Sequence, residues 1–208
     1  MNRIVVCAAL KAELKAVLEN TNITSGKKFL SGMMYSSDRF DILRTGMGKN
    51  SISSVVGPYI SEHRPGLIIH LGTAGALIES LSVGEVFLVE TYMFRERLIK
   101  PAWLEMFPGL PWPVSGLVTV DEAVTDPDRR SRLFLKSGMP LVDMEGFHIA
   151  EIVRNTGIPL LSLKVVSDRA NRNAATDFND GIDSLTVILK EQLELLLKHE
   201  DIRRYTGL

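Results

Sequence analysis

The sequence predicts a single domain of the α/β class, in which helices cover both faces of a mostly parallel β-sheet. Three continuous apolar runs carry this prediction, at residues 3–9, 66–72 and 160–166. A strand with one face in water alternates apolar and polar residues, whereas a continuous apolar run is typical of a parallel strand covered on both faces. Stretches with helical spacing lie between these runs, as expected for alternating strands and helices. A length of 208 residues suits one domain with a sizeable core, or at most two small ones.

The composition argues against several classes of protein. The net charge of −1 provides no global field that would recruit nucleic acid or an anionic membrane surface. The one cysteine, Cys7, excludes a disulfide framework or a cysteine metal site within one chain, and the four histidines lack clustered ligand spacing. The first apolar run is too short for a signal peptide, and no run approaches the ~20 residues of a membrane helix. We therefore expect a cytoplasmic protein with no metal site.

The first half of the chain is expected to start with a strand and a helix. Leu14, Val17 and Leu18 have helical spacing, so a helix follows the first strand over residues 11–18. Two strands at 28–36 and 39–45 are expected to form a hairpin, and a helix is expected after the Gly46/Gly48 loop. Further strands are expected at 66–72 and 85–92. The glycine loop could expose backbone N–H groups to an anion, but it matches neither nucleotide fingerprint, and a tight turn is the simpler interpretation.

The segment over residues 94–114 has no clear period. It contains four prolines and both tryptophans, Trp103 and Trp112. Long irregular segments in compact domains are usually functional loops or partner surfaces. These aromatic side chains could close over a planar ligand or become buried in a dimer contact.

The second half is expected to contain a strand–helix–strand unit over residues 141–168. Gly157 and Pro159 end its helix. Around this unit we expect a strand at 117–120, a helix at 127–135, a polar loop at 169–181 and a leucine-striped helix at 182–198.

Acidic residues stand where three of these strands end. Glu13 follows the first strand, Glu145 lies between the strand and helix of the 141–168 unit, and Asp168 lies just past the third strand. Ligands of open parallel sheets bind outside the carboxyl ends of the strands. Paired carboxylates suit cleavage of a glycosidic bond, in which one acid protonates the leaving group and another activates water. The alternatives are a chance alignment and, for Glu13, a simple acid in a first helical turn.

Five motifs together resemble the purine nucleoside phosphorylase and uridine phosphorylase superfamily, closest to its methylthioadenosine/S-adenosylhomocysteine nucleosidase branch. They are Ala9 followed by Glu13, TGMGK, LGTAGAL, VDMEG and VVSD, and they lie within residues 3–198. The resemblance implies a three-layer α/β/α fold with a central mixed, mostly parallel sheet. It also implies a nucleosidase domain over residues 1–199, followed by a C-terminal tail at 200–208.

The resemblance also implies roles for residues that act on the base and on water. Asp168 matches the general acid that protonates or hydrogen-bonds N7 of a departing purine, and Ser167 matches the serine that positions it. Glu13 matches the glutamate that orients and deprotonates the attacking water.

Four further residues match groups that bind the substrate. Glu145 matches the glutamate that holds the ribose hydroxyls, and Met144 matches the methionine packed against the sugar. Thr73 stands where the branch usually has a serine, and Phe178 matches the aromatic residue that closes over the nucleoside. Before the resemblance is considered, Thr73 could equally belong to a compact turn, and His70 is read as a core residue.

Hydrolysis is the expected reaction, because His70 replaces an arginine that phosphorylases commonly use for phosphate and Glu13 is present. One alternative is a phosphorylase with inorganic phosphate as co-substrate, because Lys49 and Arg44 could bind the phosphate. A second alternative is a non-catalytic nucleoside-binding protein.

No cofactor is expected. The family implies a homodimer or higher homo-oligomer. Residues 120–123 lack the family's stacking phenylalanine, so a larger nucleoside such as futalosine or an adenosyl-lipid is possible.

Overall fold

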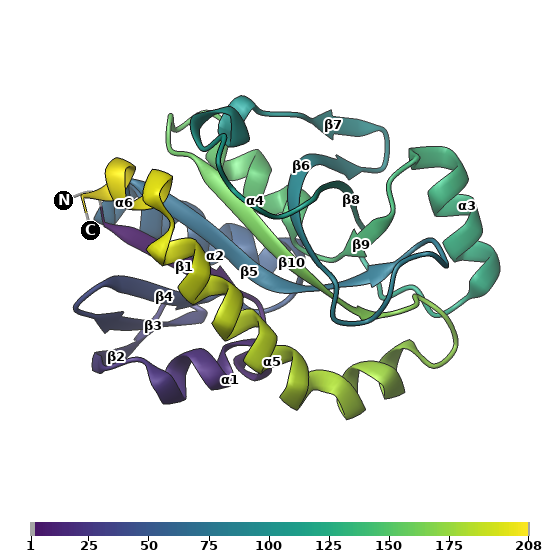
Figure 1. Cartoon of the computed structure of the whole chain (residues 1–208), viewed down its shortest axis with the longest axis horizontal. Helices are drawn as coiled ribbons and strands as arrows, with labels where there is room; N and C mark the ends of the chain where they lie inside the picture. The colour runs from purple at the N-terminus through teal and green to yellow at the C-terminus, as the bar shows by residue number, and fades with distance from the viewer. Residues whose placement is uncertain (1–2, 208) are drawn as a thin grey trace.

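The computed structural model describes residues 3–207 and shows strands and helices that alternate over most of the chain (Figure 1). The elements in order are β1 (Ile4–Ala8), α1 (Lys11–Asn20), β2 (Ile23–Phe29), β3 (Gly32–Ser37), β4 (Phe40–Arg44), α2 (Gly48–His63), β5 (Leu67–Ala76), β6 (Val86–Phe94), β7 (Arg97–Ile99), the 3-10 helix η1 (Ala102–Met106), β8 (Val114–Thr119), α3 (Pro127–Ser137), β9 (Leu141–Asp143), α4 (Gly146–Val153), β10 (Leu160–Asp168), α5 (Ala174–Lys198) and α6 (Glu200–Thr206).

The strands form one mixed sheet in the order β10-β6-β8-β9-β5-β1-β4-β3-β2, with β7 added to β6. Parallel pairing joins β1 to β4 and β5, β10 to β5, and β8 to β6 and β9. Because β10 pairs with both β5 and β6, the strands β5, β10, β6, β8 and β9 form a closed circuit. The mixed sheet and the α/β class predicted from the sequence are confirmed.

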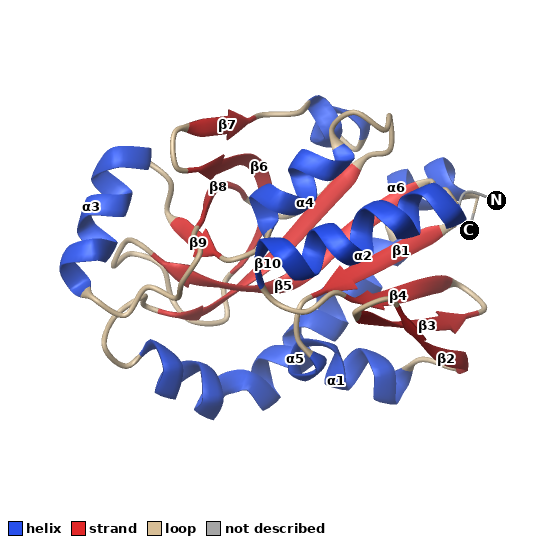
Figure 2. Cartoon of the chain, turned by 180° about the vertical axis from the view of Figure 1, so that it is seen from behind, coloured by secondary structure: helices blue, strands red, loops and turns tan. Residues whose placement is uncertain are grey.

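Helices cover both faces of the sheet, which makes the fold three-layered (Figure 2). Strand β1 shows why its apolar run is continuous. Val5 and Cys7 belong to the core that includes α2 and α4, whereas Ile4 and Val6 belong to the core that includes α1 and α5. A third, smaller cluster packs against α3. Both faces of the strand therefore exclude water, as its sequence predicted.

Two strand predictions were wrong in their extent. The run expected as one strand at 28–36 is divided between β2 and β3, because Leu30 turns the backbone with a positive φ of 53°. The strand expected to end at Gly72 continues to Ala76, because its last residues pair with β10 and β9. The hairpin between β3 and β4 is present.

The aromatic residues of 94–114 pack on the body of the protein instead of forming an exposed surface. Phe107 is buried in the core beneath α5, and Trp103 makes an edge contact with Tyr92. The indole N–H of Trp112 donates a hydrogen bond to Gln192 of α5 at 2.8 Å. This segment therefore anchors α5 to the sheet.

The C-terminal part of the chain is more helical than expected. Helix α5 begins at Ala174, so much of the polar stretch expected as a loop at 169–181 is its first two turns. Helix α6 lies in the expected tail, and its Ile202 is completely buried in the same core as α5. The boundary at residue 199 stays a prediction.

Candidate active site

A cavity of about 260 Å³ opens beyond the carboxyl ends of β1, β5 and β10. The seven residues predicted from the sequence to form the site all line it: Glu13, Thr73, Met144, Glu145, Ser167, Asp168 and Phe178. They come from α1, β5, the turn before α4, the end of β10 and α5, so the fold brings together residues more than 160 positions apart in the chain. Their individual roles stay predictions.

An interruption in the pairing of β5 creates the floor of the cavity. One edge of β5 pairs with β1 at residues 67–70 and with β9 only from Gly75. The residues between these two ladders have no strand beside them on that edge within the part of the chain that the structure describes. Their free backbone groups face side chains instead, as at Thr73.

The carboxylate of Glu13 fills this interruption and accepts three hydrogen bonds. Its Oε1 accepts from the backbone N–H and from the hydroxyl of Thr73, each at 2.9 Å. Its Oε2 accepts from the backbone N–H of Leu10 at 3.0 Å, which also caps the start of α1. The Glu13 side chain therefore has a fixed direction toward the cavity, although only 4% of the residue is exposed.

Asp168 also lines the cavity and is held by the end of its own strand. Its Oδ2 accepts from the Ser167 hydroxyl at 2.6 Å, and its Oδ1 accepts from the backbone N–H of Ala170 at 2.8 Å. A Cβ atom added at Gly75 would lie 3.0 Å from Oδ1, so the glycine makes room for the carboxyl group. The Ser167 hydroxyl thus contacts the Asp168 carboxyl group directly, and its role in positioning that acid stays a prediction.

Glu145 stands immediately before α4, is 8% exposed, and accepts from the backbone N–H of Gly48 at 3.1 Å. Burial raises its pKa to about 7, with further increases from the nearby charges of Asp143 and Glu13. Lys164 and the Gly48 hydrogen bond oppose this rise. Glu145 therefore exchanges its proton close to neutral pH.

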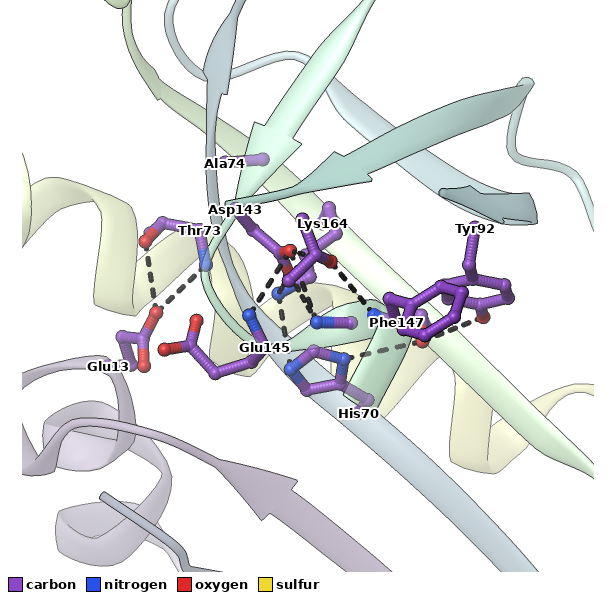
Figure 3. A network of polar contacts seen from close by, with 12 residues as sticks. Glu13, His70, Thr73, Ala74, Tyr92, Asp143, Glu145, Phe147 and Lys164 are labelled. Carbon is purple, nitrogen blue, oxygen red and sulfur yellow. Dashed lines mark hydrogen bonds and ion pairs between the residues drawn. The ribbon is translucent and has the colours of Figure 1, made fainter. Parts of the chain in front are cut away.

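A buried ion pair below Glu145 was missed by the sequence analysis. Lys164 Nζ lies 3.0 Å from Asp143 Oδ2, and both side chains are almost completely buried (Figure 3). Asp143 Oδ1 accepts from the Thr119 hydroxyl at 2.7 Å, and the backbone N–H of Gly146 donates to Asp143 Oδ2 at 2.9 Å. A lysine inside the apolar run of β10 could have signalled this pair, because a buried lysine requires a partner.

The remaining walls are mostly apolar. The side of the cavity next to β8 and β9 carries small aliphatic side chains: Val120, Ala123, Val124 and Val142. Phe178 of α5 is the one aromatic residue among the described residues of the lining, and it is partly buried. None of these lining residues is lysine, arginine or histidine, and Arg44 and Lys49 are not among them. No group of three His, Cys, Asp or Glu side chains in residues 3–207 has the arrangement of a metal site.

Comparisons with known proteins show the family of this chain. The family model of the phosphorylase superfamily matches residues 3–115 and 114–198. A relative from Shewanella oneidensis, named 5'-methylthioadenosine/S-adenosylhomocysteine nucleosidase, is 26% identical over 88% of this chain and 92% of its own length.

Two solved structures from Helicobacter pylori share the fold. The 5'-methylthioadenosine/S-adenosyl homocysteine nucleosidase, complexed with a pyrrolopyrimidine-bearing pyrrolidinol, superposes with a TM-score of 0.84 at 15% identity and covers 94% of this chain and 97% of its own. Futalosine hydrolase superposes with a TM-score of 0.81 at 15% identity, covering 93% of this chain and 96% of its own.

Proposed function

Because the chain belongs to the phosphorylase superfamily, we propose that it hydrolyses the N-glycosidic bond of a purine-type nucleoside in the cavity lined by Glu13, Glu145 and Asp168. The relative from Shewanella oneidensis and the two Helicobacter pylori structures carry the names of a nucleosidase and a hydrolase, which supports the same reaction class.

The charge of the cavity favours water over phosphate as the nucleophile. A phosphorylase must hold a phosphate dianion, typically with arginine or lysine donors. The described lining residues include four carboxyl groups and no basic side chain, and the nearby ammonium of Lys164 is already paired with Asp143. A phosphate dianion would meet repulsion here, whereas neutral water would not.

Glu13 is suited to act on that water. Its carboxylate is fixed by three hydrogen bonds, yet an oxygen with two lone pairs can still accept a further hydrogen bond from a water molecule in the cavity. We assign Glu13 as the general base that orients the water and takes its proton while the water oxygen bonds to C1′ of the sugar.

Asp168 and Glu145 act on the two sides of the breaking bond. As the C1′–N9 bond breaks, its electron pair moves into the purine, and Asp168 donates a proton to N7, so that a neutral base departs. Glu145 in its ionised form accepts hydrogen bonds from the ribose hydroxyls and stabilises the oxocarbenium-like transition state. Ser167 orients Asp168, Met144 packs against the sugar, and Phe178 covers the nucleoside. The products are the free base and the free sugar.

The test is an incubation of the protein with a panel of purine nucleosides, with and without inorganic phosphate, and with chromatographic detection of free base. Release of base in the absence of phosphate, and its loss in Glu13→Gln, is the expected result. A strict requirement for phosphate with formation of a sugar 1-phosphate would establish the phosphorylase alternative. Saturable binding without release from any nucleoside would establish a non-catalytic binder.

Other properties expected from the sequence stay predictions. These are the cytoplasmic location, the homo-oligomeric assembly and a reaction without a cofactor. No helix among residues 3–207 is long and apolar enough to cross a membrane.

A further inference from the structure

A chain of buried polar side chains runs from below the cavity into the sheet. Tyr92 donates to the Ser162 hydroxyl at 2.9 Å, and Ser162 Oγ lies 3.4 Å from His70 Nδ1. His70 Nε2 lies 3.2 Å from Lys164 Nζ, and Lys164 pairs with Asp143 (Figure 3). Of these residues, Asp143 is the one that also lines the cavity. The other four belong to the interior of the sheet and have no role in the reaction described above.

The contacts of His70 define its protonation state. A lysine ammonium has only donors, so His70 Nε2 must accept from Lys164. The ring hydrogen is then on Nδ1, where it can be donated to Ser162. Burial and the charge of Lys164 both lower the pKa of His70 well below its ordinary value, in agreement with a neutral ring. His70 is therefore a neutral acceptor that satisfies one of the three ammonium hydrogens of Lys164.

Lys164 is a buried cation that lies near three carboxyl groups. It pairs directly with Asp143, and its charge acts on Glu145. A Cβ atom added at Gly72 would lie 3.2 Å from Lys164 Nζ and 3.1 Å from Glu13 Oε1, so both groups lie against the same side of this glycine. One positive charge thus faces acids from α1, from β9 and from the turn before α4.

The ion pair also fixes the turn that carries Glu145. Asp143 accepts from the backbone N–H groups of Glu145 and Gly146, at 3.2 and 2.9 Å. An Asp143 without its cation would be a buried, uncompensated charge at the base of this turn.

We propose that His70 is a positioning residue, which holds the Lys164 ammonium in place so that the Asp143 turn and the ionised carboxylate of Glu145 stay in position for catalysis. This role rests on the proposed nucleosidase function and deepens it. The groups facing Glu145 are Glu13 on α1, the N–H of Gly48 on α2, Asp143 on β9 and Lys164 on β10. His70 acts on Glu145 through Lys164.

The test uses two substitutions of His70 whose side chains differ in length. In His70→Gln an amide oxygen can occupy the position of Nε2 and accept from Lys164, whereas in His70→Asn the side chain is too short. Ser162→Ala is the matched control, because it removes the contact at Nδ1 and leaves Nε2 with Lys164. The ionisation of Glu145 is followed without substrate by carboxyl-carbon NMR, with Glu145→Gln assigning the signal. The pH profile of kcat is measured on the best nucleoside.

We expect His70→Asn to raise the pKa of Glu145, to move the acid limb of the kcat profile to higher pH, and to lower kcat at neutral pH roughly ten- to hundredfold, as for a lost hydrogen bond to a buried charge. His70→Gln should restore most of this loss, and Ser162→Ala should leave the limb in place. Equal effects of His70→Asn and Ser162→Ala, or no movement of the Glu145 titration, would overturn the proposal.

Two further outcomes are decisive. If His70→Asn does not fold, Lys164→Met replaces it in the titration, and an unchanged Glu145 signal there would also overturn the proposal. If the wild-type protein releases no base from any nucleoside, the proposed function fails, but the substrate-free titration still decides whether His70 and Lys164 set the ionisation of Glu145.

Discussion

Substitution of Glu145 by glutamine is expected to stabilise the protein in alkaline solution and to have little effect in acid. Glutamine has the shape of the protonated glutamate and keeps an oxygen that can accept from the Gly48 N–H. It removes the negative charge of Glu145, which is unfavourable in the folded protein because the carboxylate is buried and lies near Asp143. The same substitution should abolish most of the turnover, because the ribose hydroxyls lose their carboxylate acceptor.

The magnitude follows from the pKa of Glu145, which rises from 4.5 to about 7 in the folded protein. The folded state therefore binds this proton more tightly than the unfolded state. Binding of this proton adds to the free energy of unfolding at low pH, and this stabilisation is lost as the pH rises from 4.5 to about 7. At about 1.4 kcal/mol per pH unit, the wild-type protein loses about 3 kcal/mol relative to Glu145→Gln across this window.

Urea unfolding at pH about 4.5 and about 8.5 measures this difference for the wild-type protein, for Glu145→Gln and for the exposed control Glu122→Gln. Comparison between the two pH values cancels any change in packing that is independent of charge. For the control Glu122→Gln, the difference in stability from the wild type should be the same at both pH values. The same result for Glu145→Gln would refute the raised pKa of the buried Glu145 carboxyl group.

Three other substitutions test the site. Asp168→Asn should lower kcat about 10²- to 10⁴-fold with an unchanged circular dichroism spectrum, and near-normal turnover would remove Asp168 from the role of general acid. Gly72→Ala places a Cβ atom 3.1 Å from Glu13 Oε1 and 3.2 Å from Lys164 Nζ. It should cost about 1–3 kcal/mol in urea unfolding, so a stability equal to that of the wild type would contradict this crowding. Thr73→Val removes the hydroxyl that donates to Glu13 and should reduce turnover roughly tenfold, whereas Thr73→Ser should retain it; equal rates would show that the hydroxyl is dispensable.

The sheet and the position of the site could be predicted because they depend on local patterns. Continuous apolar runs identify strands buried on both faces, and β1, β5 and β10 are such strands. Glu13 follows β1 and Asp168 ends β10, and these two acids had to gather at one edge, because both strands run parallel to β5 and the carboxyl ends of parallel strands lie together. Glu145 follows β9, which pairs antiparallel with β5, so this rule does not account for its position. The cavity with Glu13, Glu145 and Asp168 lies at that edge.

The start of α5 could not be predicted, because its signal is tertiary. Residues 169–181 are polar and contain Gly181, which is unfavourable inside a helix. In the structure Ala174 is buried and Phe178 faces the cavity, so packing stabilises turns that their local sequence does not favour. The aromatic residues of 94–114 are a similar case, since Trp112 finds its partner Gln192 80 residues later.

The contact between His70 and Lys164 depends on the register of two strands. His70 lies opposite Ser162 and Gly72 lies opposite Lys164 in the parallel pair of β5 and β10. The sequence identifies both runs as buried strands but does not define which residues face each other. A shift by one residue would turn Lys164 to the other face of the sheet, away from Asp143.

The interruption between β1 and β9 gives the protein an internal reporter. Most amide hydrogens of β5 exchange with solvent only when neighbouring strands separate, but that of Thr73 is held by the side chain of Glu13. A rotation of this one carboxyl group is enough to release it. Hydrogen exchange at a single backbone position therefore records how often the proposed general base leaves its place, without any substrate present.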